Sequence, residues 1–113
     1  MTLKVFFEPK SVAVIGASNS PGKLGHAVLK NLVEGGYARK GKIYPINPTA
    51  DSILGLPAYP NVKAVPDAIE LAVIVIPYQL VPEALRLCGE KKIPAAIVIS
   101  AGFREAGMEG LER

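Results

Sequence analysis

The order of a strand, a glycine-rich loop and a helix over residues 11–34 constrains the fold more than any other feature of the chain. Residues 12–15 have the sequence Val-Ala-Val-Ile, which is typical of a strand buried on both faces. The predicted strand covers residues 11–16 and ends at Gly16. A small polar loop follows. The helical spacing of Gly25, Val28, Leu29 and Leu32 then predicts an amphipathic helix over residues 23–34. Such a junction gathers free backbone N–H groups and a positive helix end, which together bind phosphate.

The glycine spacing of this loop differs from the usual dinucleotide fingerprint. Its glycines are Gly16, Gly22 and Gly25, so the pattern is G-x5-G-x2-G and not G-x-G-x-x-G. The longer loop predicts a wider cradle. We expect Gly22 and Gly25 to allow close approach of the backbone to a ligand and close packing of the helix on the strand. A plain strand-to-helix turn remains the alternative, and the glycines alone do not decide between them.

The rest of the chain continues the alternation of strands and helices. Its apolar runs predict three more strands, at residues 42–46, 71–76 and 95–99. They also predict a second helix at residues 81–91 and a single helical turn at residues 65–69. Pro45 lacks a backbone donor and favours an edge position for its strand, whereas the uniformly apolar 71–76 favours a central one. We expect Gly35 and Gly36 to end the first helix in the left-handed conformation. This order predicts an α/β fold: a three-layer, Rossmann-like parallel sheet with helices on both faces.

Composition narrows the class of protein. Half of the 113 residues are apolar and 20% are charged, which is typical of one globular domain, here spanning residues 1–113. A fifth strand is expected after the fourth, so we expect a truncated domain. The sequence contains no bilayer-spanning run and no signal peptide. Its single cysteine, Cys88, is consistent with a reducing cytoplasm. We expect Cys88 to be buried, because it lies on one apolar helix face with Val81, Ala84 and Leu85. The net charge of +3 comes from scattered Lys and Arg, which argues against a nucleic-acid partner.

The unusual residues of the chain follow the four predicted strands. Ligands of open α/β sheets bind at the carboxyl ends of strands, near the point where the strand order reverses. The segments at these ends are 16–22, 47–48, 77–78 and 100–102. A site for a nicotinamide dinucleotide would carry an acid after the second strand, where this chain has Asn47 and Pro48 and no acid before Asp51. NAD is therefore disfavoured, and NADP is less firmly excluded.

Four motifs in order carry a resemblance to a known family: 11–18 with Pro21-Gly22-Lys23-x-Gly25, then 41–48, 71–77 and 99–103. Over essentially the whole chain, the sequence resembles the CoA-binding domain of NDP-forming acyl-CoA synthetases, including ADP-forming acetyl-CoA synthetases. It is similar to the N-terminal domain of the succinyl-CoA synthetase alpha subunit. The resemblance implies that the chain binds coenzyme A as part of an acid–thiol ligase, whose downstream domains or subunit are absent here and would be its partners.

The resemblance also implies which residues bind the cofactor. The loop and the start of the helix would hold phosphates of the ADP moiety, through Gly16, Ala17, Ser18, Asn19, Pro21, Gly22, Lys23 and Gly25. The later segments would lie beside the nucleotide (Asn47, Pro48), form the wall under it (Pro77, Tyr78) and contact the pantetheine arm (Ile99, Ser100, Ala101). Relatives often have a lysine directly after the second-strand proline. This chain has Thr49 and Ala50 there, and Lys23 and Lys42 are the candidates to replace that charge.

No catalytic or metal-binding residue is expected in this chain. The family relays phosphoryl through a histidine of a later domain, and the single histidine here, His26, falls on the polar stripe of the first helix with no acid one turn away. We therefore interpret His26 as a solvated helix residue. Two other functions remain open from sequence: a stand-alone, non-catalytic CoA-binding protein and an NADP-dependent oxidoreductase domain.

Overall fold

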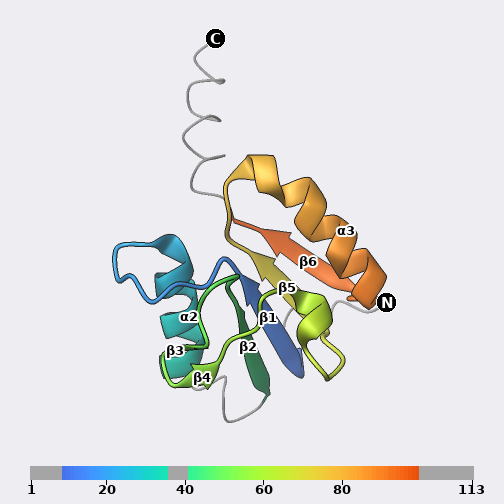
Figure 1. Cartoon of the computed structure of the whole chain (residues 1–113). Coiled ribbons are helices and arrows are strands. Elements are labelled where there is room, and N and C mark those ends of the chain that lie inside the picture. The colour runs from blue at the N-terminus through green and yellow to red at the C-terminus, as the bar shows by residue number, and fades with distance from the viewer. Residues whose placement is uncertain (1–8, 36–40, 100–113) are drawn as a thin grey trace.

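A four-stranded parallel sheet between two helices forms the centre of the protein (Figure 1). The structure is a computed structural model and describes residues 9–35 and 41–99. The strands lie in the order β2 (Lys42–Ile46), β1 (Ser11–Ile15), β5 (Leu71–Ile74) and β6 (Ala95–Val98). The predicted Rossmann-like α/β fold is confirmed, including the edge position of the strand that contains Pro45 and the central position of β5.

The strand order reverses between β1 and β5. From β1 the chain passes through α2 (Leu24–Glu34) to β2 on one side. From β5 it passes through the short helix η3 (Tyr78–Leu80) and α3 (Val81–Lys91) to β6 on the other side. Leu29 of α2 belongs to one core cluster and Ala84 of α3 to the other, so the two helices cover opposite faces of the sheet. Right-handed crossovers on either side of β1 produce this arrangement. The carboxyl ends of β1 and β5 therefore border the crevice in which such sheets bind ligands.

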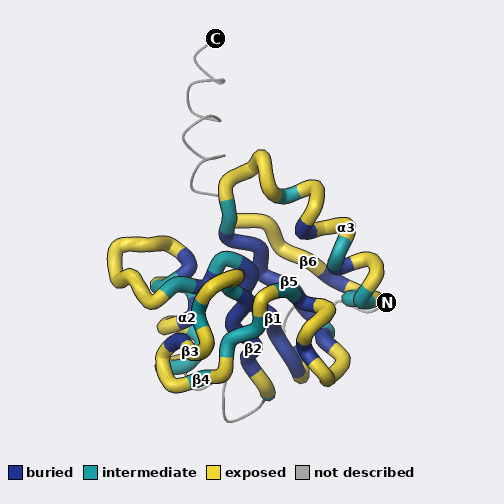
Figure 2. Tube along the Cα trace, viewed as in Figure 1, coloured by how far each residue is buried: buried dark blue, intermediate teal, exposed yellow. Residues whose placement is uncertain are grey.

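Each face of the sheet has its own apolar core. On one face Val12, Val14 and Val73 pack with Leu29 of α2. On the other face Ala13, Ile15 and Ile74 pack with Ala84 and Cys88 of α3. Because successive residues of β1 point to opposite faces, its buried run contributes to both cores. Figure 2 shows β1 as part of the buried centre of the molecule.

One predicted element lies elsewhere in the chain, and one small element was not predicted. The predicted helical turn at 65–69 lies earlier, as the 3-10 helix η2 (Val62–Ala64), because the Asn61 side chain caps the backbone N–H of Ala64. The segment after β2 contains a small antiparallel hairpin of β3 (Ser52–Ile53) and β4 (Leu56–Pro57).

The first helix does not end in the conformation predicted for its glycines. Gly35 has a φ of −75°, so it ends α2 without the left-handed conformation, and Gly36 lies outside the described residues. In α3 it is Lys92, with a φ of 64°, that takes the left-handed C-cap. No helix in the described ranges is long and apolar enough to cross a membrane.

Candidate functional site

Gly16 lies where β1 meets its two neighbouring strands at their carboxyl ends. Its backbone N–H donates to the carbonyl of Ile46, and the Val75 N–H donates to the carbonyl of Ile15. Gly16 has a φ of +97°, and a Cβ there would stand 2.0 Å from the carbonyl oxygen of Val75. Only glycine fits this turn, because the conformation and the space both exclude a side chain.

The other two loop glycines have different roles. A Cβ on Gly25 would stand 1.9 Å from the carbonyl oxygen of Gly16, so the predicted close packing of the helix on the strand end is confirmed there. A Cβ on Gly22 would meet no protein atom within 4 Å. Gly22 is therefore not required by the packing of this chain, and the space above it is open to a ligand.

Side chains fix the path of the loop between Gly16 and α2. The Ser18 hydroxyl accepts a hydrogen bond from the N–H of Ser20, and the Asn19 amide donates to the carbonyl of Ser52 in the hairpin. His26 is half-buried, and its Nδ1 lies 2.9 Å from the carbonyl oxygen of Ser18. A carbonyl accepts only, so Nδ1 carries the proton in this contact. His26 thus anchors the loop, which differs from the fully solvated role that the helical pattern predicted.

Asn47 connects the loop after β2 to the loop after β1. Its Nδ2 donates to the carbonyl of Ala17 at 2.9 Å. Its Oδ1 accepts from the backbone N–H groups of Thr49 and Ala50 and from the Thr49 hydroxyl. The side chain therefore holds two neighbouring loops in a fixed relation at the carboxyl edge of the sheet.

A cavity of about 350 Å³ opens between these loops and the first turn of α2. Seven of its lining residues are among those predicted to bind the cofactor: Gly16, Ala17, Ser18, Lys23, Gly25, Asn47 and Pro77. The first turn of a helix has N–H groups without intrahelical partners, and Lys23 at the N-cap adds a positive charge. The lining therefore suits a phosphate, and the open space over Gly22 leaves room for a diphosphate.

The remaining predicted residues are spread around this cavity. Asn19, Pro21 and Gly22 are exposed on the loop, and Pro48 lines a second cavity described below. Tyr78 is exposed in η3, and Ile99 follows β6, where its N–H donates to the carbonyl of Ile74. Ser100 and Ala101 lie outside the described residues.

Lys42 was wrongly considered as a replacement for the missing basic contact. It begins β2, whereas the cavity lies beyond the other end of that strand, about 16 Å away at the usual rise per residue. Its ammonium group instead lies 3.7 Å from the carboxylate of Asp67. Lys23 is the lysine that lines the cavity.

The predicted set of buried residues on α3 is partly wrong. Ala84 and Cys88 are buried as predicted, but Leu85 is 43% exposed, and Leu87 packs against the core in its place. Burial raises the pKa of the Cys88 thiol, which keeps it in the unreactive protonated form. In residues 9–35 and 41–99 no group of three His, Cys, Asp or Glu side chains could hold a metal ion.

Comparison with known proteins gives a consistent result. Residues 10–113 match a family model described as a CoA binding domain. The chain is 50% identical over 109 residues to the ADP-forming acetate–CoA ligase I of Archaeoglobus fulgidus, covering 95% of this chain and 15% of the relative. It is 47% identical over 114 residues to the alpha subunit of the ADP-forming acetate–CoA ligase I of Pyrococcus furiosus, covering 97% of this chain and 24% of that subunit.

A solved structure shares the same fold. It is the dinucleotide forming acetyl-coenzyme A synthetase 1 of Ca. Korarchaeum cryptofilum in complex with phosphate and ADP, with a TM-score of 0.84 and 46% identity. The match covers 98% of this chain and 24% of that one. The chain thus spans between about a seventh and a quarter of the length of these proteins. The resemblance inferred from the four sequence motifs is confirmed, and the chain belongs to the family of CoA-binding domains found in ADP-forming acyl-CoA synthetases.

Proposed function

We propose that this chain holds the ADP portion of coenzyme A over residues 16–25, as the cofactor-binding domain of an ADP-forming acyl-CoA ligase. The observation that carries the proposal is the junction of Gly16 and Gly25. It brings a helix N-terminus, an N-cap lysine and an open cavity to the reversal point of the sheet. Coenzyme A would supply the thiol that accepts the acyl group.

In this proposal the chain's own residues bind and orient the cofactor. Free N–H groups in the first turn of α2 and the Lys23 ammonium group would neutralise the diphosphate. Asn47 and His26 would act through the backbone, because each holds a loop carbonyl and thereby sets the direction of the loop. The other predicted residues complete the site: Ala17, Ser18, Asn19, Pro21, Gly22, Pro48, Pro77, Tyr78, Ile99, Ser100 and Ala101.

The acyl transfer itself would require the rest of the ligase. The chain covers 15–24% of the two ligases compared. In this proposal the carboxylic acid, the nucleotide and the phosphoryl relay would be handled by other portions of the ligase. The buried free thiol of Cys88 supports a cytoplasmic location, since a reducing compartment keeps such a thiol free. The scattered basic residues support a small polyphosphate as the ligand in preference to nucleic acid.

Calorimetric titration with coenzyme A tests the proposal. The Gly22→Val variant adds a side chain where the protein leaves space, so it should fold normally and still keep phosphate away from the backbone. We expect at least a tenfold weaker affinity, about 1.4 kcal/mol. Gly89→Val on α3, where a Cβ also meets nothing within 4 Å, is the matched control and should bind as the unaltered chain does. Equal affinity in the unaltered chain and Gly22→Val would remove this loop from the site.

A further inference from the structure

One flank of α3 faces η2 across a second cavity, of about 340 Å³. Glu83 and Leu87 line this cavity from α3, and Val62 lines it from η2. Because Val62 belongs to the core cluster that contains Ile46 of β2, η2 lies over the β2 side of the sheet. Pro48 lines the cavity where the chain leaves β2. This flank of α3 therefore faces away from β6, which is at the opposite edge of the sheet.

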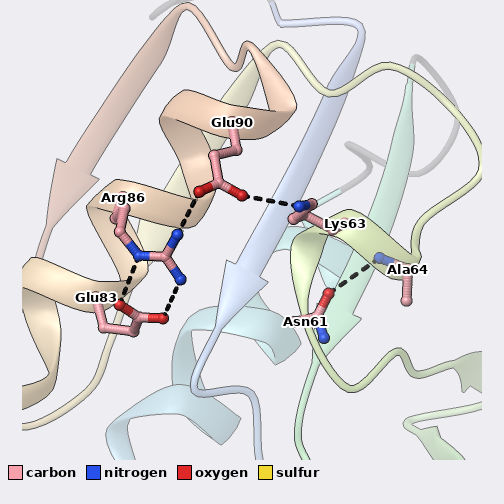
Figure 3. A network of polar contacts seen from close by, with 6 residues as sticks. All are labelled: Asn61, Lys63, Ala64, Glu83, Arg86 and Glu90. Carbon is pink, nitrogen blue, oxygen red and sulfur yellow. Dashed lines mark hydrogen bonds and ion pairs between the residues drawn. The ribbon is translucent and has the colours of Figure 1, made fainter.

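Ion pairs connect the same two elements (Figure 3). The Lys63 ammonium group of η2 donates to the Glu90 carboxylate of α3 at 2.8 Å. Arg86 contacts both Glu90 and Glu83. The charged side chains at these three positions of α3 thus gather on one flank of the helix, and η2 already covers that flank.

The opposite flank of α3 is uncharged and open. Leu85 lies two residues from Glu83 and two from Leu87, which places it about 160° around the helix from both. Pro82, Leu85 and Gly89 follow one another at i, i+3 and i+7 along this flank, and all three are exposed, Leu85 by 43%. The exposed Leu85 is therefore part of a continuous uncharged stripe.

Strand β6 extends this stripe onto the sheet. Ala95 belongs to the core cluster on the α2 face, so Val98, three residues later, points to the α3 face. Val98 is 45% exposed, although α3 packs against β6. Leu85, Gly89 and Val98 together form an uncovered apolar surface, the α3–β6 surface.

Gly89 leaves room on this surface for a second helix. A Cβ atom at this position would meet no atom within 4 Å, so the packing of residues 9–35 and 41–99 does not require a glycine here. A glycine inside a helix is less favourable than alanine, because a more flexible backbone has to be ordered. A glycine beside the exposed Leu85 permits another backbone to lie close to α3.

We propose that residues 103–113 of this chain form a helix that packs on the α3–β6 surface. Their apolar and small residues have the helical spacing i, i+3, i+4, i+7 and i+8, at Phe103, Ala106, Gly107, Gly110 and Leu111. Charged residues fall on the other side of such a helix, at Arg104, Glu105, Glu109 and Glu112. The apolar side of the helix matches an uncharged surface, and the proposal does not depend on the binding of coenzyme A.

The end of β6 brings this segment within reach of the surface. The N–H of Ile99 donates to the carbonyl of Ile74, which fixes the chain at the carboxyl end of β6, four residues before Phe103. Helix α3 begins at the same end of the sheet, because it follows the carboxyl end of β5. A connection of a few residues, here 100–102, is long enough to turn the chain back along α3.

The two helices have complementary shapes. Helix α3 contains 11 residues, as many as the segment 103–113, and each is about 16 Å long as a helix. When the two run side by side in the same direction, Gly107 lies opposite Leu85 and Leu111 lies opposite Gly89. Each large side chain then meets a small residue, so the ridge of one helix fits the groove of the other.

The fluorescence of a single tryptophan tests the proposal, because the chain contains none. Phe103→Trp places an indole on the contact side of the helix, and acrylamide quenching measures its exposure. We expect a protected indole in the otherwise unaltered chain. Leu85→Glu should release it, since burying the new carboxylate would shift the docking equilibrium by at least about tenfold. Leu54→Glu is the matched control: this leucine of the β3–β4 hairpin is 37% exposed, and its substitution should leave the indole protected.

A second variant, Gly89→Leu, fills the point of closest approach and should release the indole too. Circular dichroism establishes that each variant folds, and Gly89→Leu decides the matter if Leu85→Glu does not fold. Leu85 and Gly89 line neither cavity, so both variants should keep their affinity for coenzyme A. An indole that is fully exposed in the otherwise unaltered chain, or that stays protected in either folded variant, would overturn the proposal. Protection that disappears on dilution would assign the surface to a second copy of the chain and would overturn it as well.

Discussion

The carbonyl oxygen of Gly16 lies 1.9 Å from the position that a Cβ atom on Gly25 would occupy. Neither partner has room to move, because Gly16 is hydrogen-bonded to β2 and a Cβ on it would meet Val75. The first turn of α2 is therefore in direct backbone contact with the end of β1. This contact places the helix N-terminus at the crevice.

Gly25→Ala should destabilise the fold by up to about 3 kcal/mol, because the added methyl meets backbone that cannot yield. Urea denaturation followed by circular dichroism measures the change. Gly22→Ala is the matched control, with an expected change within about 0.5 kcal/mol, since its Cβ would meet no protein atom. A Gly25→Ala variant as stable as the control would show that α2 can move away from the strand without loss.

Coenzyme A should bind at least tenfold more tightly than NAD. The residue after β2 is Asn47, whose amide is occupied by Ala17, Thr49 and Ala50. It does not supply the carboxylate that a nicotinamide dinucleotide requires for its ribose hydroxyls. Titration of both ligands into the same preparation measures the ratio. Binding of NAD as tight as that of coenzyme A would favour an oxidoreductase domain instead.

The chain alone should form no acyl-CoA above background from ATP, acetate and coenzyme A. A phosphoryl relay needs a histidine whose attacking nitrogen is free and whose other nitrogen is oriented by a partner such as a carboxylate. The Nδ1 of His26 contacts the carbonyl of Ser18 and serves to hold the loop. Thioester formation is the measurement, with His26→Ala alongside. Turnover by the chain alone would contradict this prediction, and its loss in His26→Ala with an unchanged affinity for coenzyme A would show that this histidine is catalytic.

Asp67 should contribute to stability at neutral pH and lose this contribution in acid. The Tyr44 hydroxyl donates to its carboxylate at 2.6 Å, and this bond, followed by the charge of Lys42, lowers the pKa of Asp67. A lowered pKa in the folded state means that the contribution is complete above the ordinary value of about 3.9 and fades as the pH falls below it.

Denaturation midpoints of the unaltered chain and Asp67→Asn at neutral pH and at about pH 3 measure this effect. The difference between the two proteins should be smaller in acid. Tyr44→Phe removes the larger cause of the lowered pKa and should weaken the pH dependence in the same direction. A difference that is the same at both pH values would contradict the role assigned to the carboxylate.

The alternation of strands and helices could be predicted from the sequence because a strand buried on both faces has no polar residues to interrupt it. The runs before Gly16 and Pro77 are of this kind. The glycine loop was recognisable as well, because Gly25 recurs with Val28 and Leu29 on the apolar side of α2. These features are local and need no knowledge of which segments meet in space.

The errors concern relations between distant segments. Leu87 packs against the core in place of Leu85 because of the way α3 crosses the sheet. The helical spacing of apolar residues alone does not determine this orientation. The bond of His26 to Ser18 depends on the path of the loop. Two missed features did have a signal: Asn61 is a strong N-cap residue, and a parallel sheet already places Lys42 at the end of its strand far from the cavity.

The position of β6 has a practical consequence for work with the purified domain. Among the described strands β6 pairs with β5 alone, and Ile97 and Val98 are 38% and 45% exposed (Figure 2). Within residues 9–35 and 41–99 the outer backbone edge of this apolar strand is unpaired, and such an edge is a template for other chains, which add to it by the same hydrogen bonds that build a sheet. Self-association of the 113-residue domain should therefore rise with protein concentration. A charged substitution such as Val98→Lys should reduce the addition of other chains to this edge, and Val98 lines neither cavity.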